Sequence, residues 1–208
     1  MLRYGLIDAE YAMRLRETAG DVDGPIYMLG LTRLRPGTDT SPRGLPALGR
    51  DTLSEFAPIP LLSAVGAALC LAASVVASSP DWDRVGVVSF PSRRSFLELA
   101  DRRDFREWHA RKVESVERMT VLGTLPAEGL PAVDCQRLLL EVWNGPEPTP
   151  LVTEPTARFD VEGTVVGDGR QWSGIRYTAI ELGTALPLHP PRFGYQALLL
   201  APALERWR

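Results

Sequence analysis

Two side chains of this 208-residue chain have types and positions suited to acid–base or electrostatic chemistry. His109 flanks an apolar stripe at helical spacing in DFREWHARKVESV, and an imidazole titrates near neutral pH without large perturbation. Arg176 alternates with Ile175 and Tyr177 in a predicted strand, so its guanidinium must face solvent, a carboxylate or a bound anion. In a catalytic site, His109 would move a proton and Arg176 would stabilise a developing oxyanion. The alternatives are a helix-packing histidine and a solvated arginine.

Aromatic side chains at strand positions could line a ligand pocket beside these two residues. Trp82 and Trp172 each stand where a predicted strand begins, and either residue could close a hairpin or face a cavity. Trp143 and Tyr27 occupy corresponding strands and would face one cavity if two sheets meet. Core packing is the alternative for all of them. The predicted pocket residues are Tyr27, Trp82, Trp143, Trp172 and Tyr177.

Several common chemistries lack their sequence signals. Neither GxGxxG nor GxxxxGKS/T occurs, so nucleotide phosphates have no glycine-rich cradle, and the GxSxG of many hydrolases is absent. The run EGTVVGDG is expected to form a strand and a hairpin turn, in which GDG supplies the positive φ. The scattered histidines His109 and His189 do not indicate a zinc site. We therefore expect no metal and no tightly bound cofactor.

Charge and cysteine usage indicate the class of partner and the compartment. A formal net charge of -3 and a pI of about 5.5 argue against a nucleic-acid partner, because phosphate binding needs a concentrated cationic surface. Cys70 and Cys135 each lie in an apolar stretch and resemble reduced buried thiols rather than a disulfide framework. The N-terminal residues have no apolar region of the kind that secretory signals carry. The prediction is a cytoplasmic protein.

The uncharged segment from Ala57 to Pro80 is nearly long enough to span a bilayer. Pro58, Pro60, Gly66 and many small residues argue against a membrane helix. We expect instead the end of a helix, Thr52 to Val65, followed by a buried strand in ALCLAASVVA.

The chain resembles itself at an offset of ninety residues without a gap. Val75 falls on Val165, Trp82 on Trp172, and the apolar positions of the two following strands also coincide. Upstream, IYMLGLTRLRPG and RLLLEVWNGP are both strand-like runs that end in a Gly and Pro turn, at an offset of 110. The first unit is expected to read strand, helix, strand, strand, helix. The second reads strand, strand, strand, helix, because four prolines replace its first helix.

These patterns predict an α+β protein of two related units, 1–125 and 135–208, joined by a linker at 126–134. Two antiparallel sheets packed face to face would cover one another. The state is then a monomer with an internal pseudo-dimer, or a homodimer.

DGPIYMLGLTRLRPG and the later phrase SFPSRRSFLEL resemble the ferredoxin-like domains of the dimeric α/β-barrel superfamily, in particular an uncharacterised branch of it. The resemblance covers residues 22–40 and 66–122, and is only topological over 135–208. Gly30 stands where relatives tend to have Asn. The resemblance implies two ferredoxin-like units, the second degenerate, forming a pseudo-symmetric α/β barrel. It also implies an apolar pocket between sheets and helices.

Two functions follow, because a fold of this breadth does not determine activity. The first is a small-molecule binding protein or cofactor-independent enzyme, of the cyclase, isomerase or monooxygenase type, that acts on an apolar or aromatic metabolite between the sheets. The second is a non-catalytic barrel domain that associates with itself or with a partner. A large apolar cavity with convergent polar groups would favour the first, and the absence of any cavity would favour the second.

Overall fold

The structure is a computed structural model that describes residues 6–17, 23–35, 57–79, 82–129, 135–152, 157–184, 186 and 194–205. His189 and the start of the helix predicted from Thr52 to Val65 lie outside these residues. The described elements are β1 Leu6–Ile7, α1 Ala9–Glu17, β2 Ile26–Leu34, α3 Ile59–Ser63, β3 Ala68–Ser79, β4 Arg84–Phe90, α4 Arg93–Asp101, α5 Arg103–Ser115, β5 Val116–Glu128, β6 Arg137–Trp143, β7 Ala157–Gly167, β8 Gly174–Ile180 and β9 Tyr195–Glu205.

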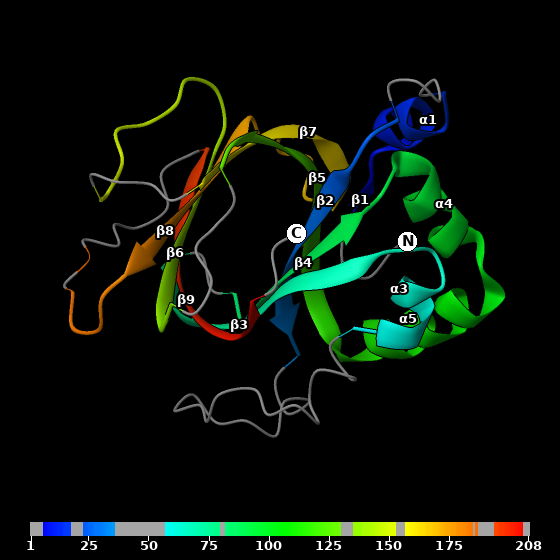
Figure 1. Ribbon diagram of the computed structural model, residues 1–208, viewed down its shortest axis with the longest axis horizontal. Coiled ribbons are helices and arrows are strands. Elements are labelled where there is room, and N and C mark those ends of the chain that lie inside the picture. Colours follow the sequence, from blue (N-terminus) through cyan, green and yellow to red (C-terminus); the bar gives the residue numbers. More distant parts are fainter. Residues whose placement is uncertain are drawn as a thin grey trace.

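All nine strands belong to one antiparallel sheet in the order β1-β7-β5-β2-β4-β3-β9-β6-β8. An additional pairing between β7 and β8 joins the two ends of this order, with Ala157 opposite Tyr177 and Asp160 opposite Gly174. The sheet therefore closes as a barrel of eight strands, and β1 is a short addition on β7 (Figure 1).

The predicted α+β fold of two ferredoxin-like units with facing sheets is wrong. The protein is mostly sheet, and β7 pairs with β5 while β9 pairs with β3, so backbone hydrogen bonds run continuously from one half of the chain to the other. The helix predicted at the C-terminal end is strand β9, in which Pro202 opposes Ala73 of β3. An internal proline disfavours a helix, and the strand places its apolar run in the barrel wall. Among residues 135–152, 157–184, 186 and 194–205 the structure has no helix.

The two halves of the barrel repeat one order of strands. The first half runs β5-β2-β4-β3 and the second runs β9-β6-β8-β7. β4 at residues 84–90 and β8 at residues 174–180 are separated by ninety residues, which is the offset of the sequence repeat. The alignment fails after β8, because it matched β9 to the helix α5. β5 continues to Glu128, past the predicted end of the first unit at residue 125.

The interior of the barrel is filled by side chains that alternate along each strand. On β6, Leu138, Leu140 and Val142 belong to the inner cluster, whereas Leu139 belongs to a separate cluster on the outside. Phe159 belongs to the inner cluster and packs edge-on against Tyr27 at 5.4 Å and Tyr177 at 5.5 Å between ring centroids. An eight-stranded barrel has an interior just wide enough for such side chains.

Helices cover the outer face of one side of the barrel (Figure 1). α1 packs against α4 and β7, α3 packs against β3, and α5 packs against β5. A second apolar cluster joins helix residues, among them Leu99 of α4, to the outward strand residues Ile26 and Phe90. The prediction for Ala57 to Pro80 is confirmed over the described residues, with α3 followed by β3. Within the described ranges, no helix has the length and apolar content needed to cross a bilayer.

Because the interior is filled, a substitution that creates a cavity there should destabilise the protein. Phe159→Ala should lower the free energy of unfolding by about 3–5 kcal/mol, because the loss of a buried ring leaves a void that packed strands cannot collapse. Benzene should then raise the melting temperature of the variant and leave that of the parent protein unchanged. Leu182→Ala is the control, since Leu182 is 60% exposed. Stabilisation of the parent protein by benzene would contradict a filled barrel.

Candidate functional site

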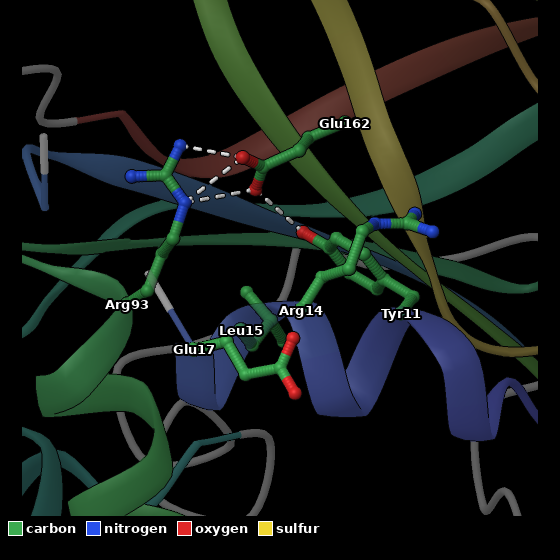
Figure 2. Close-up of a pocket in the computed structure, with 6 residues that line it drawn as sticks. All are labelled: Tyr11, Arg14, Leu15, Glu17, Arg93 and Glu162. Carbon is green, nitrogen blue, oxygen red and sulfur yellow. Dashed lines mark hydrogen bonds and ion pairs between the residues drawn. The ribbon is translucent and has the colours of Figure 1, made fainter. Parts of the chain in front are cut away.

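A cavity of about 300 Å³ lies on the outside of the barrel, where α1 faces β7 and the start of α4. It is lined by Tyr11, Arg14, Leu15, Glu17, Arg93 and Glu162 (Figure 2). A more open depression of about 420 Å³ is lined by Arg102, Arg103, Asp104 and Glu107, which pair with one another on the exposed surface of α4 and α5. We take the first cavity as the candidate site, because it contains a buried charged residue.

Arg93 is held at the floor of this cavity by the first turn of α4. Ser92 is the N-cap and accepts a hydrogen bond from the Ser95 amide at 3.0 Å. The Asp23 carboxylate accepts hydrogen bonds from the amides of Arg93 at 2.6 Å and of Arg94 at 3.3 Å, which adds a negative charge to the helix N-terminus. The local sequence therefore fixes the backbone position from which the Arg93 side chain extends.

Glu162 receives the Arg93 guanidinium from the opposite wall. Arg93 Nη2 donates to Glu162 Oε1 at 2.6 Å, and Nε donates to Oε1 at 2.9 Å and to Oε2 at 3.1 Å. The side chain of Arg93 is 8% exposed, and that of Glu162 is 26% exposed. The register between β5 and β7 shifts from Gly123–Gly163 to Thr124–Val161, so Glu162 is the extra residue of a β-bulge. Bulges re-aim side chains in this way at functional sites and edges.

Tyr11 completes the network from α1. Its hydroxyl donates to Glu162 Oε2 at 2.9 Å. Burial, and then the neighbouring Glu162 carboxylate, raise the pKa of Tyr11 well above its usual value, so the phenol keeps its proton. The ring lies on two cross-strand glycines: a Cβ at Gly123 would be 2.0 Å from the Tyr11 hydroxyl oxygen, and one at Gly163 would be 2.3 Å from the ring. These glycines form the notch that docks α1.

Four of the predicted pocket residues come together, but as packed core. Tyr27, Trp82, Trp172 and Tyr177 all belong to the inner cluster and are at most 7% exposed. Trp82 Nε1 donates to Gln196 Oε1 at 3.0 Å, and the guanidinium of Arg118 stacks over its ring. Burial is the main cause that raises the pKa values of Tyr27 and Tyr177.

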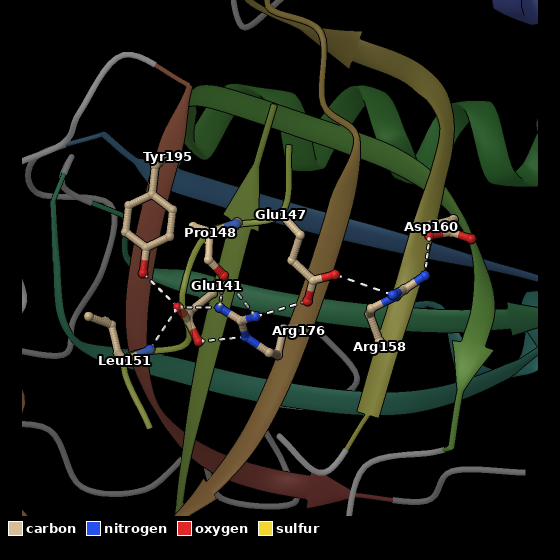
Figure 3. A network of polar contacts seen from close by, with 8 residues as sticks. All are labelled: Glu141, Glu147, Pro148, Leu151, Arg158, Asp160, Arg176 and Tyr195. Carbon is tan, nitrogen blue, oxygen red and sulfur yellow. Dashed lines mark hydrogen bonds and ion pairs between the residues drawn. The ribbon is translucent and has the colours of Figure 1, made fainter. Parts of the chain in front are cut away.

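Arg176 and Trp143 lie on the outer face of the barrel, away from both the inner cluster and the cavity. The sequence predicted that Arg176 faces solvent, a carboxylate or a bound anion, and in the structure it faces a carboxylate. Its Nε and Nη2 donate to the two oxygens of Glu141, each at 2.9 Å. Nη1 donates to Glu147 at 3.0 Å, and the Tyr195 hydroxyl donates to Glu141 at 2.7 Å (Figure 3). The guanidinium also lies 5.2 Å from the centroid of the Trp143 ring.

His109 lies on α5, outside the barrel and apart from Arg176. Its ring stacks on Phe105 with centroids 5.9 Å apart. Burial, and then the charge of Lys112, lower the pKa of His109, which favours the neutral imidazole. The structure therefore does not bring the two predicted catalytic residues into one site.

Sequence reasoning missed Tyr11, Arg93 and Glu162. One signal was available for Arg93. The phrase FPSRRS has the pattern of a strand end followed by a helix N-cap, which places this arginine in the first turn of a helix. Two isolated glycines within strands, Gly123 and Gly163, were a signal of close approach by another group. Among the described residues, no group of three or more His, Cys, Asp or Glu side chains could hold a metal ion.

Comparison with known proteins gives only distant structural likenesses. No family model matches this chain, and no curated protein matches it. A crystal structure of the methylated RPA0582 protein has a TM-score of 0.43 and 23% identity, covering 59% of this chain and 94% of that one. A second structure, of the RPA0582 protein of unknown function from Rhodopseudomonas palustris, has a TM-score of 0.42 and 23% identity, covering 57% and 95%. Likenesses at this level carry no argument about activity.

The glycine notch predicts a coupling between Gly163 and Tyr11. Gly163→Ala should lower the free energy of unfolding by about 1–3 kcal/mol, because the added methyl overlaps the Tyr11 ring. In a Tyr11→Ala background the same substitution should cost less than about 0.5 kcal/mol. Urea denaturation of the four proteins of this cycle measures the difference. Gly24→Ala is the control, since nothing lies within 4 Å of a Cβ there. Equal losses in both backgrounds would show that α1 does not dock on the notch.

The buried ion pair predicts that Arg176 is needed for stability. Arg176→Leu should lower the free energy of unfolding by about 3–5 kcal/mol, because it strands the Glu141 carboxylate, which is 0% exposed. Arg158→Leu is the matched control, because Arg158 also contacts Glu147 but is 37% exposed, and it should cost no more than about 1 kcal/mol. Urea denaturation compares the two. A melting temperature unchanged by Arg176→Leu would instead favour a functional role for this residue.

Proposed function

We propose that this protein is a small-molecule binding protein that holds a polar ligand in the outer cavity, with the filled barrel as its scaffold. The observation that carries this proposal is the cavity itself: about 300 Å³ of space next to the Arg93–Glu162 ion pair, on a protein whose inner cluster occupies the barrel. Ligand sites are concave and contain a few well-placed polar groups. The ligand would then lie at the surface under α1, and not between two sheets as the sequence led us to expect.

The chemistry of the cavity supports binding rather than turnover. A raised pKa keeps the Tyr11 phenol protonated, so at neutral pH this hydroxyl is a hydrogen-bond donor and a poor acid or base. The Glu162 carboxylate is already occupied by Arg93 and Tyr11, which limits its use as a general base. Arg93, Glu162 and Tyr11 thus form a pre-organised polar wall.

The position of α1 supports the same function. Leu15, which is 3% exposed, contributes an apolar surface to the cavity, and Arg14 and Glu17 contribute charges near its rim. A ligand between α1 and β7 would contact both the helix and the barrel. It would bind the folded protein but not the unfolded chain, and so it should stabilise the fold by mass action.

A screen of small polar compounds against the intact chain tests this function. We expect compounds that raise the melting temperature and shift the backbone amide NMR signals of residues 11–17, Arg93 and Glu162. At a ligand concentration of about 100 times Kd, the gain in stability should be about 2.7 kcal/mol. The amides of Arg103 to Glu107 on the exposed surface of α5 serve as the internal control. The proposal fails if no compound binds, or if every compound that binds shifts amides away from the cavity.

A further inference from the structure

A polar side chain faces the interior at one end of the barrel. Neighbouring strands in the closed sheet are antiparallel, so β4, β5, β8 and β9 run in one direction and all begin at this end. Gln196 is the second residue of β9 and is 1% exposed. It alternates with Leu198 and Leu200 of the inner cluster, so its amide points inward. Trp82 comes just before β4 and lies at the same end.

The hydrogen bond between Trp82 and Gln196 determines how this amide is turned. Trp82 Nε1 donates to Gln196 Oε1 at 3.0 Å, and the bond is buried. An indole N–H can only donate, so the amide oxygen must face it and the amide NH2 group must face away from it. The two N–H bonds of Gln196 Nε2 are therefore left for another acceptor.

Gln196 Nε2 is buried and has no hydrogen-bond partner among the described residues. The guanidinium that stacks over the Trp82 ring, that of Arg118 at 4.4 Å from the ring centroid, contains donors only and cannot be the acceptor. Val142, the residue opposite Gln196 on β6, has a hydrocarbon side chain. Buried amide groups in native proteins are almost always hydrogen-bonded, either to protein or to an ordered water.

A second buried polar atom at this end of the barrel has no partner among the described residues. Thr164 lies opposite Leu122 of the inner cluster, so its side chain also faces the interior, and the atom concerned is Oγ1. β7 runs antiparallel to β5 and β8, so this late residue of β7 lies at the end where those two strands begin. A buried water needs polar groups around it, and this end of the interior contains them.

We infer that the Gln196 amide binds a water molecule inside the barrel, at the end where Trp82 lies, with Nε2 donating to the water oxygen. Water suits this position better than a larger ligand, because Trp82 and Trp172 are only 4% and 7% exposed and belong to the packed inner cluster. Trp82 and the water together satisfy both ends of the amide, which accounts for a glutamine at a buried position of β9. The inference is independent of the outer cavity and its ligand.

Side-chain amide NMR on the intact chain tests this inference, because the chain has only three glutamines and one asparagine. The Gln196 signals are assigned by their loss in Gln196→Met, or by their contact with the Trp82 indole proton if that variant does not fold. Rotating-frame Overhauser spectra should show a dipolar cross-peak between the Gln196 NH2 group and water. The exposed amides of Gln136 and Gln171 are internal controls and should show only exchange with solvent, which gives cross-peaks of the opposite sign.

Two results of this measurement would overturn the inference. The first is a Gln196 NH2 group without a dipolar cross-peak to water, at a mixing time that does show its contact with the Trp82 indole proton. The second is a cross-peak to a bound solute in place of water, which would assign the position to a ligand.

Counting long-lived waters provides a second test. Gln196→Met should lower the oxygen-17 relaxation dispersion of the solution by the amplitude of about one long-lived water, because the variant lacks the amide that holds it. Gln171→Met is the matched control, since Gln171 is exposed, and it should leave the dispersion unchanged. An amplitude that is the same in Gln196→Met and in the parent protein would also overturn the inference.

Discussion

Closure of the sheet is the constraint on which the rest of this structure depends. Once β7 pairs with β8, each of the eight barrel strands has a neighbour on both sides, and each residue of the wall must face either a narrow interior or the outside. Apolar and aromatic side chains take up most of the interior. A site that needs charged groups and free space is therefore expected on the outer face, where helices and loops form its second wall.

Two buried arginines on the outer face show how different covers lead to different roles. Arg176 is covered by the chain between β6 and β7, where Glu147 and the Pro148 carbonyl accept from it while Glu141 takes its other donors. This guanidinium is surrounded by protein, and we expect its removal to leave the Glu141 carboxylate buried without a counter-charge. Arg93 is covered by α1 instead, and the helix leaves a cavity beside the ion pair. The two arginines therefore differ in the segment that packs over them and not in residue type.

Docking of α1 connects the barrel wall to the proposed ligand site. The Gly123–Gly163 pair removes two side chains from the wall, and the Tyr11 ring occupies the space. The same ring presents its hydroxyl to Glu162 and its face to Arg14. The packing contact and the polar wall of the cavity thus belong to one residue, so a change that loosens α1 also changes the electrostatics of the cavity.

The amino-acid sequence by itself determined the local elements of this protein: the strand after Gly66, the hairpins that begin near Trp82 and Trp172, and the alternation that sets Arg176 apart from Ile175 and Tyr177. Periodicity within a segment states which residues share a face, and that information is local. Only the tertiary structure decided that Arg176 meets Glu141, 35 positions away, and that Arg93 meets Glu162, 69 positions away. The barrel and the cavity could not be predicted from the sequence either. Pairing between distant strands such as β7 and β5 depends on which closed arrangement satisfies all backbone hydrogen bonds together.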